Sequence, residues 1–497
     1  MFDQLIEKIP PRIRALIIMC LWGGAILWLG LVRFDAFGLD EGAAIALLLN
    51  WSISDSVVST VIALGGPDFR ALLFIPLGLY WSGSMIAAKI FSLMITFAAA
   101  MVMYSWSKTR TGENDEETAL IATGLFLVAP VTLGLANSIS TGPFLLLLFG
   151  LGWILDKKYR ASEHRISSLY FIQTLLVAIT ITLHPIGLAY PLALAWHWYK
   201  NPKSDKQKKQ VWTGVAIATG IILAMRTGWV SLSWMENPLT SLTYAVLGNR
   251  TANPADISAW PGLIPAGLLL VVVIKQAKVL MKELLGSTLL LALLIGLPVA
   301  DVNWAMIAVA VLLYCGTPLL IRANKSIGQH AGFVGQRGLV MAVLFITATL
   351  FMQADRGYAT QIASGLLSPE DELMRELIPE AAQKEKAFLA ASQWPARTML
   401  IVRSDVLPLP AAKKSGEELL DTMEGRNVSI THVIFDHNDP DNTELTKNFR
   451  DITGATETLS RMPGGVILKI REAANKPPHK AAPVAPAKND NPTLPNQ

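Results

Sequence analysis

The sequence contains a series of apolar segments, each close to the length that a helix needs to cross a membrane. A transmembrane helix takes about 20 apolar residues, and shorter runs can extend into polar neighbours. The segments occupy residues 13–32, 84–105, 118–136, 140–155, 168–183, 186–199, 211–227, 261–274, 284–298, 302–320 and 338–353. Only 16% of the residues are charged, against about 25% in soluble domains. The sequence therefore predicts an α-helical polytopic membrane protein with about eleven transmembrane helices.

The first apolar segment is predicted to be a retained helix. It is too long for the apolar core of a signal peptide, and no small-residue cleavage site follows it. The two cysteines, Cys20 and Cys315, both lie inside apolar segments. Their positions indicate neither a disulfide framework nor a zinc site.

Lysine and arginine residues alternate between the two sides of the predicted membrane. Short cytoplasmic loops are enriched in these residues. With the N-terminus on the cytoplasmic side, the cytoplasmic segments hold twenty of them. The other side, up to residue 353, holds five: Arg33, Arg70, Lys89, Arg226 and Arg250. This asymmetry predicts a multi-pass protein of a bacterial inner membrane, with its N-terminus cytoplasmic and its C-terminal part periplasmic.

The chain divides into three predicted regions. Residues 1–355 form the transmembrane domain, whose periplasmic loop 33–83 contains two half-polar stretches suited to interfacial helices. Residues 356–474 alternate between helix and strand patterns, which predicts a small periplasmic α/β domain. Its expected elements are helices at 369–391 and 416–424 and strands at 398–403, 430–435 and 465–471. The proline-rich residues 475–497 form a predicted disordered tail.

Two adjacent carboxylates, Asp40 and Glu41, stand where the first span ends. Ionisable side chains at membrane depth are costly, so they tend either to be functional or to lie outside the hydrocarbon. The residues alone leave a second interpretation open. Both acids are also explained as interfacial residues, or as the N-terminal charges of a surface helix.

Several local sequences, in this order and on these sides, resemble one known family. Asp40-Glu41 opens the first outer loop, and Gly83-Ser84-Met85-Ile86-Ala87-Ala88-Lys89-Ile90 enters the second span. Leu183-His184-Pro185-Ile186-Gly187 forms a turn between spans five and six, and Asp301-Val302-Asn303-Trp304-Ala305 begins a late span. Together they resemble the polyprenyl-phosphate-sugar glycosyltransferases of the GT-C superfamily. The nearest branch holds protein O-mannosyltransferases and lipid A aminoarabinose transferases.

The resemblance implies transfer of a hexosyl or pentosyl group, with inversion, from a polyprenyl-phosphate donor to an acceptor on the periplasmic face. Such chemistry needs a general base beside the acceptor and a cation at the departing phosphate. Asp40 matches the first acid of the family's pair and is the expected base, with Glu41 beside it. Arg70 and Lys89 are the expected phosphate-binding cations, with Arg250 a third choice. The alternative is that these cations reach lipid headgroups.

The sequence departs from the family pattern at three places. The first loop reads Pro67-Asp68-Phe69-Arg70, where the family has Lys or His before Pro-Pro. At the start of span four the chain has Gly142, where many members have an acid. Lys89 stands where an arginine is common. These departures leave open a non-catalytic member of the family.

Four further residues are expected as substrate contacts: His184, Asp301, Asn303 and Trp304. Each also has a plainer explanation, as a helix-ending residue or an interfacial anchor. The cluster of His432, Asp436, His437, Asp439 and Asp441 invites a metal site, but it also describes a turn at the end of a strand. No cofactor is implied, and a divalent metal has no support from ligand spacing.

The expected partners are a polyprenyl-phosphate-linked sugar, membrane lipids and an acceptor that is a lipid, a glycan or a protein. Nucleic acid is not among them. Two other functions stay open. One is a transporter of a lipid carrier or a small molecule, although the internal repeats of many transporters are not evident. The other is a non-catalytic membrane scaffold whose outer domain binds a partner.

Overall fold

The computed structural model describes residues 11–36, 38–51, 70, 74–77, 84–111, 116–161, 167–200, 216, 220, 238–247, 262–298, 301–364, 369–383, 388–409, 430–437, 439, 442–451, 456–462 and 464–470. The chain forms two compact units, Met1–Ser368 and Pro369–Gln497. Outside the described residues lie Pro67–Phe69, most of the span expected at 211–227, Arg250, the helix expected at 416–424 and the tail.

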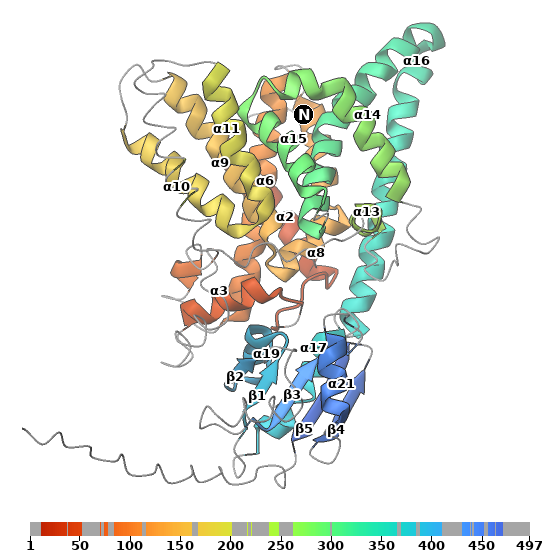
Figure 1. Cartoon of the computed structure of the whole chain (residues 1–497). Coiled ribbons are helices and arrows are strands. Elements are labelled where there is room, and N and C mark those ends of the chain that lie inside the picture. The colour runs from red at the N-terminus through yellow and green to blue at the C-terminus, as the bar shows by residue number, and fades with distance from the viewer. Residues whose placement is uncertain are drawn as a thin grey trace, which may run out of the picture. The chain divides into compact units, whose positions relative to one another are not determined.

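The first unit is helical (Figure 1). Its helices are α2 (Pro11–Trp28), α3 (Glu41–Trp51), α6 (Met85–Thr111), α7 (Glu116–Leu127), α8 (Pro130–Ser138), α9 (Thr141–Ala161), α10 (Ser167–Leu183), the 3-10 helix η2 (Pro185–Leu188), α11 (Ala189–Lys200), α13 (Pro238–Leu247), α14 (Leu263–Leu280), α15 (Leu284–Gly296) and α16 (Val302–Ser364). Helix α3 lies across one end of the bundle that the longer helices form (Figure 1).

Three of the described helices are long and apolar enough to cross a membrane: Met85–Arg110 in α6, Leu263–Leu280 in α14 and Val302–Arg322 in α16. Several helices carry large apolar side chains on their outer faces, such as Trp28 at 90% exposure and Ile264 at 70%. Apolar surface of this kind suits contact with lipid. The chain is therefore a helical membrane protein, while the count of eleven spans stays a prediction.

The span expected at 118–136 is not one straight helix. It is divided into α7 and α8, which meet at an angle of 54°. Proline has no N–H and disfavours a helical conformation in the residue before it. Ala129, directly before Pro130, is extended, with φ −67° and ψ 132°. The break therefore follows from Pro130, which the apolar pattern alone did not reveal.

The second unit contains a five-stranded sheet with the order β2-β1-β3-β5-β4. The strands are β1 (Ala390–Ser392), β2 (Val406–Pro408), β3 (His432–Phe435), β4 (Thr456–Met462) and β5 (Gly465–Ile470). β1 pairs in parallel with β2 and β3, while β5 is antiparallel to β3 and β4. The core includes Val433, Phe435 and Leu468. Strands β3 and β5 lie where the sequence predicts strands.

Two predictions for this unit are wrong. The strand expected at 398–403 is helix α19 (Pro395–Val402). Pro395 occupies the first turn of this helix, a position that proline favours, and Arg403 ends it in the left-handed conformation. The helix expected at 369–391 is instead two short helices, α17 (Pro369–Arg375) and α18 (Ile378–Ala381), followed by β1. The remaining described helix is α21 (Thr443–Asp451).

Candidate functional site

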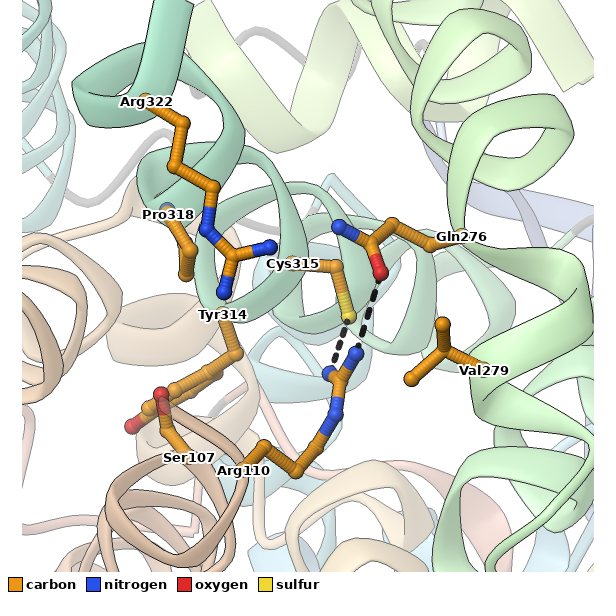
Figure 2. Close-up of a pocket in the computed structure, with 8 residues that line it drawn as sticks. All are labelled: Ser107, Arg110, Gln276, Val279, Tyr314, Cys315, Pro318 and Arg322. Atoms are coloured by element: carbon orange, nitrogen blue, oxygen red, sulfur yellow. Dashed lines mark hydrogen bonds between the residues drawn. The ribbon is translucent and has the colours of Figure 1, made fainter. Parts of the chain in front are cut away.

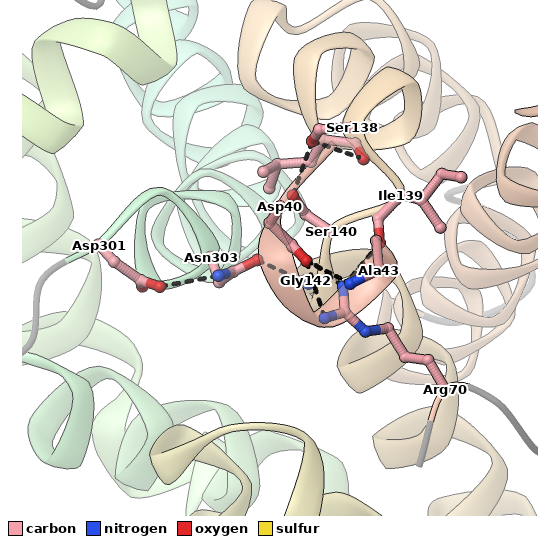
Figure 3. A network of polar contacts seen from close by, with 10 residues as sticks. Asp40, Ala43, Arg70, Ser138, Ile139, Ser140, Gly142, Asp301 and Asn303 are labelled. Atoms are coloured by element: carbon pink, nitrogen blue, oxygen red, sulfur yellow. Dashed lines mark hydrogen bonds and ion pairs between the residues drawn. The ribbon is translucent and has the colours of Figure 1, made fainter. Parts of the chain in front are cut away.

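The turn between α8 and α9 is the centre of the candidate site (Figure 3). Helix α8 ends at Ile139, which adopts φ 56° and ψ 34° and donates its N–H to the Leu135 carbonyl. A β-branched residue rarely adopts this left-handed conformation. The conformation persists only where surrounding contacts stabilise it. One such contact is the hydrogen bond from Arg70 to the Ile139 carbonyl.

Asp40 and Arg70 form a two-point ion pair beside this turn. Arg70 Nη1 donates to Asp40 Oδ2 at 2.9 Å, and Nη2 donates to Oδ1 at 2.8 Å. Arg70 Nη1 also donates to the Ile139 carbonyl at 2.8 Å. The Arg70 side chain is 3% exposed and that of Asp40 is 39% exposed. The expected base and the expected cation thus lie in direct contact, and Arg70 connects both to the strained turn.

Asp40 also begins helix α3. Its Oδ1 accepts a hydrogen bond from the Ala43 N–H at 2.6 Å, and its carbonyl accepts one from Ala44. This is the geometry of an N-cap residue. Glu41 lies in the first turn of the same helix, where an acid is favoured by the helix dipole. The interpretation of both acids as N-terminal residues of a surface helix therefore fits this geometry as well.

The structure places Lys89, the second expected phosphate-binding cation, among buried residues. It is fully buried in α6, and its Nζ donates to the backbone carbonyl of Asn137. Free carbonyls at a helix C-terminus attract cations. Lys89 and Arg70 therefore bind carbonyls two residues apart at the end of α8.

A second cluster of polar side chains connects the N-termini of three helices. His184 Nε2 lies 2.9 Å from Asp301 Oδ2, and Asn303 Nδ2 donates to the same oxygen at 2.7 Å. Asn303 Oδ1 accepts the Gly142 N–H at 2.8 Å. His184 Nδ1 accepts the Ile186 N–H, so Nε2 carries the proton toward Asp301. His184, Asp301 and Asn303 thus connect the starts of η2, α16 and α9. Figure 3 shows Asp301 and Asn303 beside Gly142 and Asp40.

A hydrogen bond between Asp301 and Trp304 stabilises the N-terminus of α16. Asp301 Oδ1 accepts the Trp304 N–H at 2.9 Å. Burial raises the pKa of Asp301, but its interaction with His184 and the hydrogen bonds from Trp304 and Asn303 outweigh this effect, so the pKa is lowered overall. Trp304 itself is 3% exposed and donates its indole N–H to the Leu293 carbonyl at 3.0 Å. It packs between helices, and this burial does not fit a ring that stacks on a sugar.

No protein-family model matches the sequence, and no curated protein is similar to it in sequence. The structure is similar to the archaeal oligosaccharyltransferase AglB from Archaeoglobus fulgidus in complex with an inhibitory peptide and a dolichol-phosphate, with TM-score 0.50 at 10% identity over 85% of this chain and 69% of that one. The apo form from the same organism gives a TM-score of 0.51 at 10% identity, over 86% and 70%. ArnT from Cupriavidus metallidurans bound to undecaprenyl phosphate gives 0.49 at 11% identity, over 92% and 98%.

The chain therefore has a fold similar to that of the AglB oligosaccharyltransferase. At 10% identity this likeness concerns the fold alone, so the role of each residue rests on the local geometry. The fold agrees with the family that the ordered motifs around Asp40, His184 and Asp301 resemble.

Gly142 is one of the positions at which the sequence departs from the family that it resembles. A Cβ atom there would lie 3.1 Å from Leu135 Cδ1 and from Met306 Sδ, and 3.2 Å from Asn303 Oδ1. Such contacts are tighter than ordinary packing. In this chain Asn303 approaches the backbone where the larger side chain would stand.

Sequence reasoning missed several polar residues around this candidate site. Asn137 Oδ1 accepts the Arg33 N–H, and its Nδ2 donates to the Tyr358 hydroxyl at 3.0 Å. Asp355, one helical turn before Tyr358, is 8% exposed, and its Oδ1 has no hydrogen-bond partner among the described residues. The only signal in the sequence was a polar residue inside an apolar segment, which is how Asn137 stands out.

The histidine and aspartate residues of the second unit, for which a metal site and a turn were both considered, have other partners. Asp439 Oδ2 accepts from Gln393 Nε2, and the Asp436 N–H donates to Gln393 Oε1. His432 instead faces Glu380 at 3.6 Å. Among the described residues no group of three or more His, Cys, Asp or Glu residues could hold a metal; Asp441 lies outside them. Both described cysteines are free.

Proposed function

We propose that this protein is a membrane glycosyltransferase that moves a sugar from a polyprenyl-phosphate donor to an acceptor on the periplasmic face. The observation that carries the proposal is the ion pair of Asp40 with the buried Arg70 at the start of α3. In a GT-C fold this places a partly exposed carboxylate next to a cation. The AglB structure, of the same fold, holds a dolichol-phosphate.

Asp40 has the capacity to act as a general base. An ionised carboxylate has about four lone-pair positions. Three are used by donors from Ala43 and Arg70, which leaves one on Oδ2 for the proton of an acceptor hydroxyl or amine. As that proton moves to Asp40, the acceptor atom bonds to the anomeric carbon. The bond from this carbon to the phosphate oxygen breaks, and the lipid phosphate leaves with the electron pair.

Arg70 is the cation proposed to receive the lipid phosphate. Its terminal nitrogens bond Asp40 and the Ile139 carbonyl. Arginine binds phosphate and carboxylate with the same two-point geometry. A donor phosphate would therefore replace one oxygen of Asp40 on Arg70 and free that oxygen for the acceptor. His184, Asp301 and Asn303 are proposed to hold the surrounding helix starts in position.

The test compares two variants that differ only at Asp40. R70M keeps the carboxylate, and D40N/R70M removes it without leaving a buried charge unpaired. Mass spectrometry of glycans and lipid A from cells with and without the protein first identifies the product. We expect the double variant to form this product about 100-fold more slowly than R70M, since a general base contributes about 10²–10⁴-fold.

The matched control is D35N. Asp35 lies in the same loop, is 41% exposed and is paired with Arg33 at 2.7 Å, yet it has no proposed role. Equal product formation by R70M and D40N/R70M, both above the level in cells without the protein, would remove Asp40 as the base. A loss in D35N as large as in the double variant would show that any disturbed ion pair of this loop has the same effect.

A second candidate function is transport of a lipid carrier. The 54° break between α7 and α8 favours it, because transporters build substrate sites at broken helices. Flux of a lipid-linked sugar across proteoliposomes, without any transfer product, would support transport over transfer.

A further inference from the structure

At the opposite end of α6 from Lys89, two arginines point toward one cavity (Figure 2). The cavity has a volume of about 60 Å³ and is lined by α6, α14 and α16. Arg110 reaches it from α6 and Arg322 from α16. Lys89 and Arg110 are 21 residues apart on one helix, so this pocket lies roughly 30 Å from Lys89 along the axis. That distance is close to the thickness of the hydrocarbon core.

The charge of Arg110 meets only neutral groups among the described residues. Its Nη1 donates to Cys315 Sγ at 3.3 Å and its Nη2 to Gln276 Oε1 at 3.2 Å. The guanidinium also lies over the Trp106 ring, 4.7 Å from the centroid. Its Nε is buried and has no acceptor among those residues. A partly buried cation without a carboxylate is costly, and a bound anion would remove this cost.

Arg322 adds a second positive charge to the same space. Its side chain points toward Arg110 across Cys315 in Figure 2. Within the described part of the chain, no Asp or Glu lines the cavity. Glu283, on the adjoining segment, does not line the cavity; its carboxylate accepts the Trp106 indole N–H at 2.6 Å. The positive charges of Arg110 and Arg322 repel each other, and no carboxylate in the lining offsets this repulsion. An anion bound between them would lower the electrostatic energy.

The pocket is small, with a volume of about 60 Å³, which suits a compact anionic group such as a phosphate. Pro318 lies inside α16 at the cavity and has no N–H. The Tyr314 carbonyl therefore lacks its usual helical donor on this wall. The polar wall opposite is formed by Gln276, which is 7% exposed.

The pocket lies at the level where membrane spans end. The three described helices that are long enough to cross a membrane end there, at Arg110, Leu280 and Arg322. This is the end of the bundle that the distribution of lysine and arginine assigns to the cytoplasm. Basic pockets between transmembrane helices on that side bind the phosphates of lipid headgroups.

We propose that this pocket binds the phosphate of an anionic lipid in the leaflet opposite the candidate transfer site. Arg110 and Arg322 supply the charge, and Gln276 supplies an amide beside them. The proposal does not depend on the transfer reaction. The same phosphate chemistry could also come from a free ion, and the experiment separates these sources.

The experiment measures binding to the full-length protein in detergent by native mass spectrometry and by thermal unfolding. The probes are phosphatidylglycerol, phosphatidylcholine and inorganic phosphate. We expect selective binding of phosphatidylglycerol, and roughly tenfold or greater weakening in R110Q/R322Q, because each arginine near a membrane surface contributes about 1 kcal/mol of attraction to anionic lipid. R110K/R322K keeps both charges and is expected to retain most of the binding.

The matched control is K157Q/K158Q, which removes two charges from the end of α9 outside the cavity. This control is expected to bind phosphatidylglycerol as the unmodified protein does. Equal weakening in K157Q/K158Q, or none in R110Q/R322Q, would overturn the pocket as the binding site. Binding of inorganic phosphate without preference for phosphatidylglycerol would overturn the lipid as the ligand.

Discussion

Arg70 and Arg110 differ in how the chain balances their charges. Arg70 is 3% exposed and is held by both oxygens of Asp40. Arg110 has a thiol, an amide oxygen and an indole ring as partners, with no carboxylate among the described residues. A paired guanidinium stabilises local structure, whereas one with neutral partners keeps its attraction for an external anion. Arg70 is therefore part of an ion pair within the chain, whereas Arg110 is proposed to bind an external anion.

Two other buried basic groups extend this comparison. Lys89 is balanced by a carbonyl at the end of α8. His432 is 4% exposed, and its pKa is lowered to about 4 because burial and, to a smaller extent, Lys469 oppose its charge more than Glu380 favours it. The cost of burying a basic group is thus reduced in three ways: by a carboxylate at Arg70, by helix carbonyls at Lys89 and by loss of the proton at His432. None of these applies to Arg110 among the described residues.

Removal of the carboxylate from Arg70 should have the largest effect on stability. D40N leaves the buried guanidinium without its counter-charge, which costs about 3–5 kcal/mol when such a pair is broken. The double variant D40N/R70M should recover most of this loss, because no charge remains. Thermal unfolding in detergent measures both. A D40N variant as stable as the unmodified protein would show that Arg70 does not need Asp40, and the contrast with Arg110 would disappear.

Acidification should destabilise the second unit through His432. Between its usual pKa of 6.5 and the lowered value of about 4, the unfolded chain binds a proton that the folded chain does not. The free energy of unfolding therefore falls as the pH falls from 6.5 toward 4, by about 3 kcal/mol at most. H432Q should lose this part of the pH dependence, measured by unfolding at several pH values. An unchanged slope in H432Q would assign the dependence to other groups.

Replacement of Lys89 should have a moderate effect. K89M removes the donor from the Asn137 carbonyl at the end of α8 and should cost about 2 kcal/mol, since a hydrogen bond to a charged group contributes about 1.5–3 kcal/mol. The control K157M changes an exposed lysine that lies over the Trp153 ring, 4.3 Å from its centroid. We expect K157M to unfold within about 1 kcal/mol of the unmodified protein. Equal losses would mean that the helix end does not balance Lys89.

A methyl group at Gly142 should have the smallest effect. G142A brings a Cβ to 3.2 Å from Asn303 Oδ1 and should cost about 1 kcal/mol through local overpacking. Gly124 in α7 has open space around its added Cβ. G124A should therefore be neutral or stabilise by up to about 1 kcal/mol. A stabilised G142A would show that Asn303 moves easily and does not fix the start of α9.

The sequence predicted the membrane class, the helical fold and the positions of β3 and β5, because apolar length and alternation depend on local residue types. It also predicted Asp40, Arg70, His184, Asp301 and Asn303 as site residues, and the structure brings Asp40 to Arg70 and brings Asp301 to His184 and Asn303. It failed where a single residue overrides a pattern. Pro130 breaks an apolar segment, and Pro395 begins a helix within a stretch that resembles a strand.

Pairing between distant residues was decided by the tertiary structure. Asp40 and Arg70 are 30 residues apart, and Gly142 and Asn303 are 161 apart. Residue types alone did not show how the charges of Arg70, Lys89 and Arg110 are balanced. Only the packing of α6, α8 and α16 decides which of them meets a carboxylate, which meets a carbonyl and which stays open to an anion. The reason is physical: the cost of a buried charge depends on the atoms within a few ångströms, and the fold chooses those atoms.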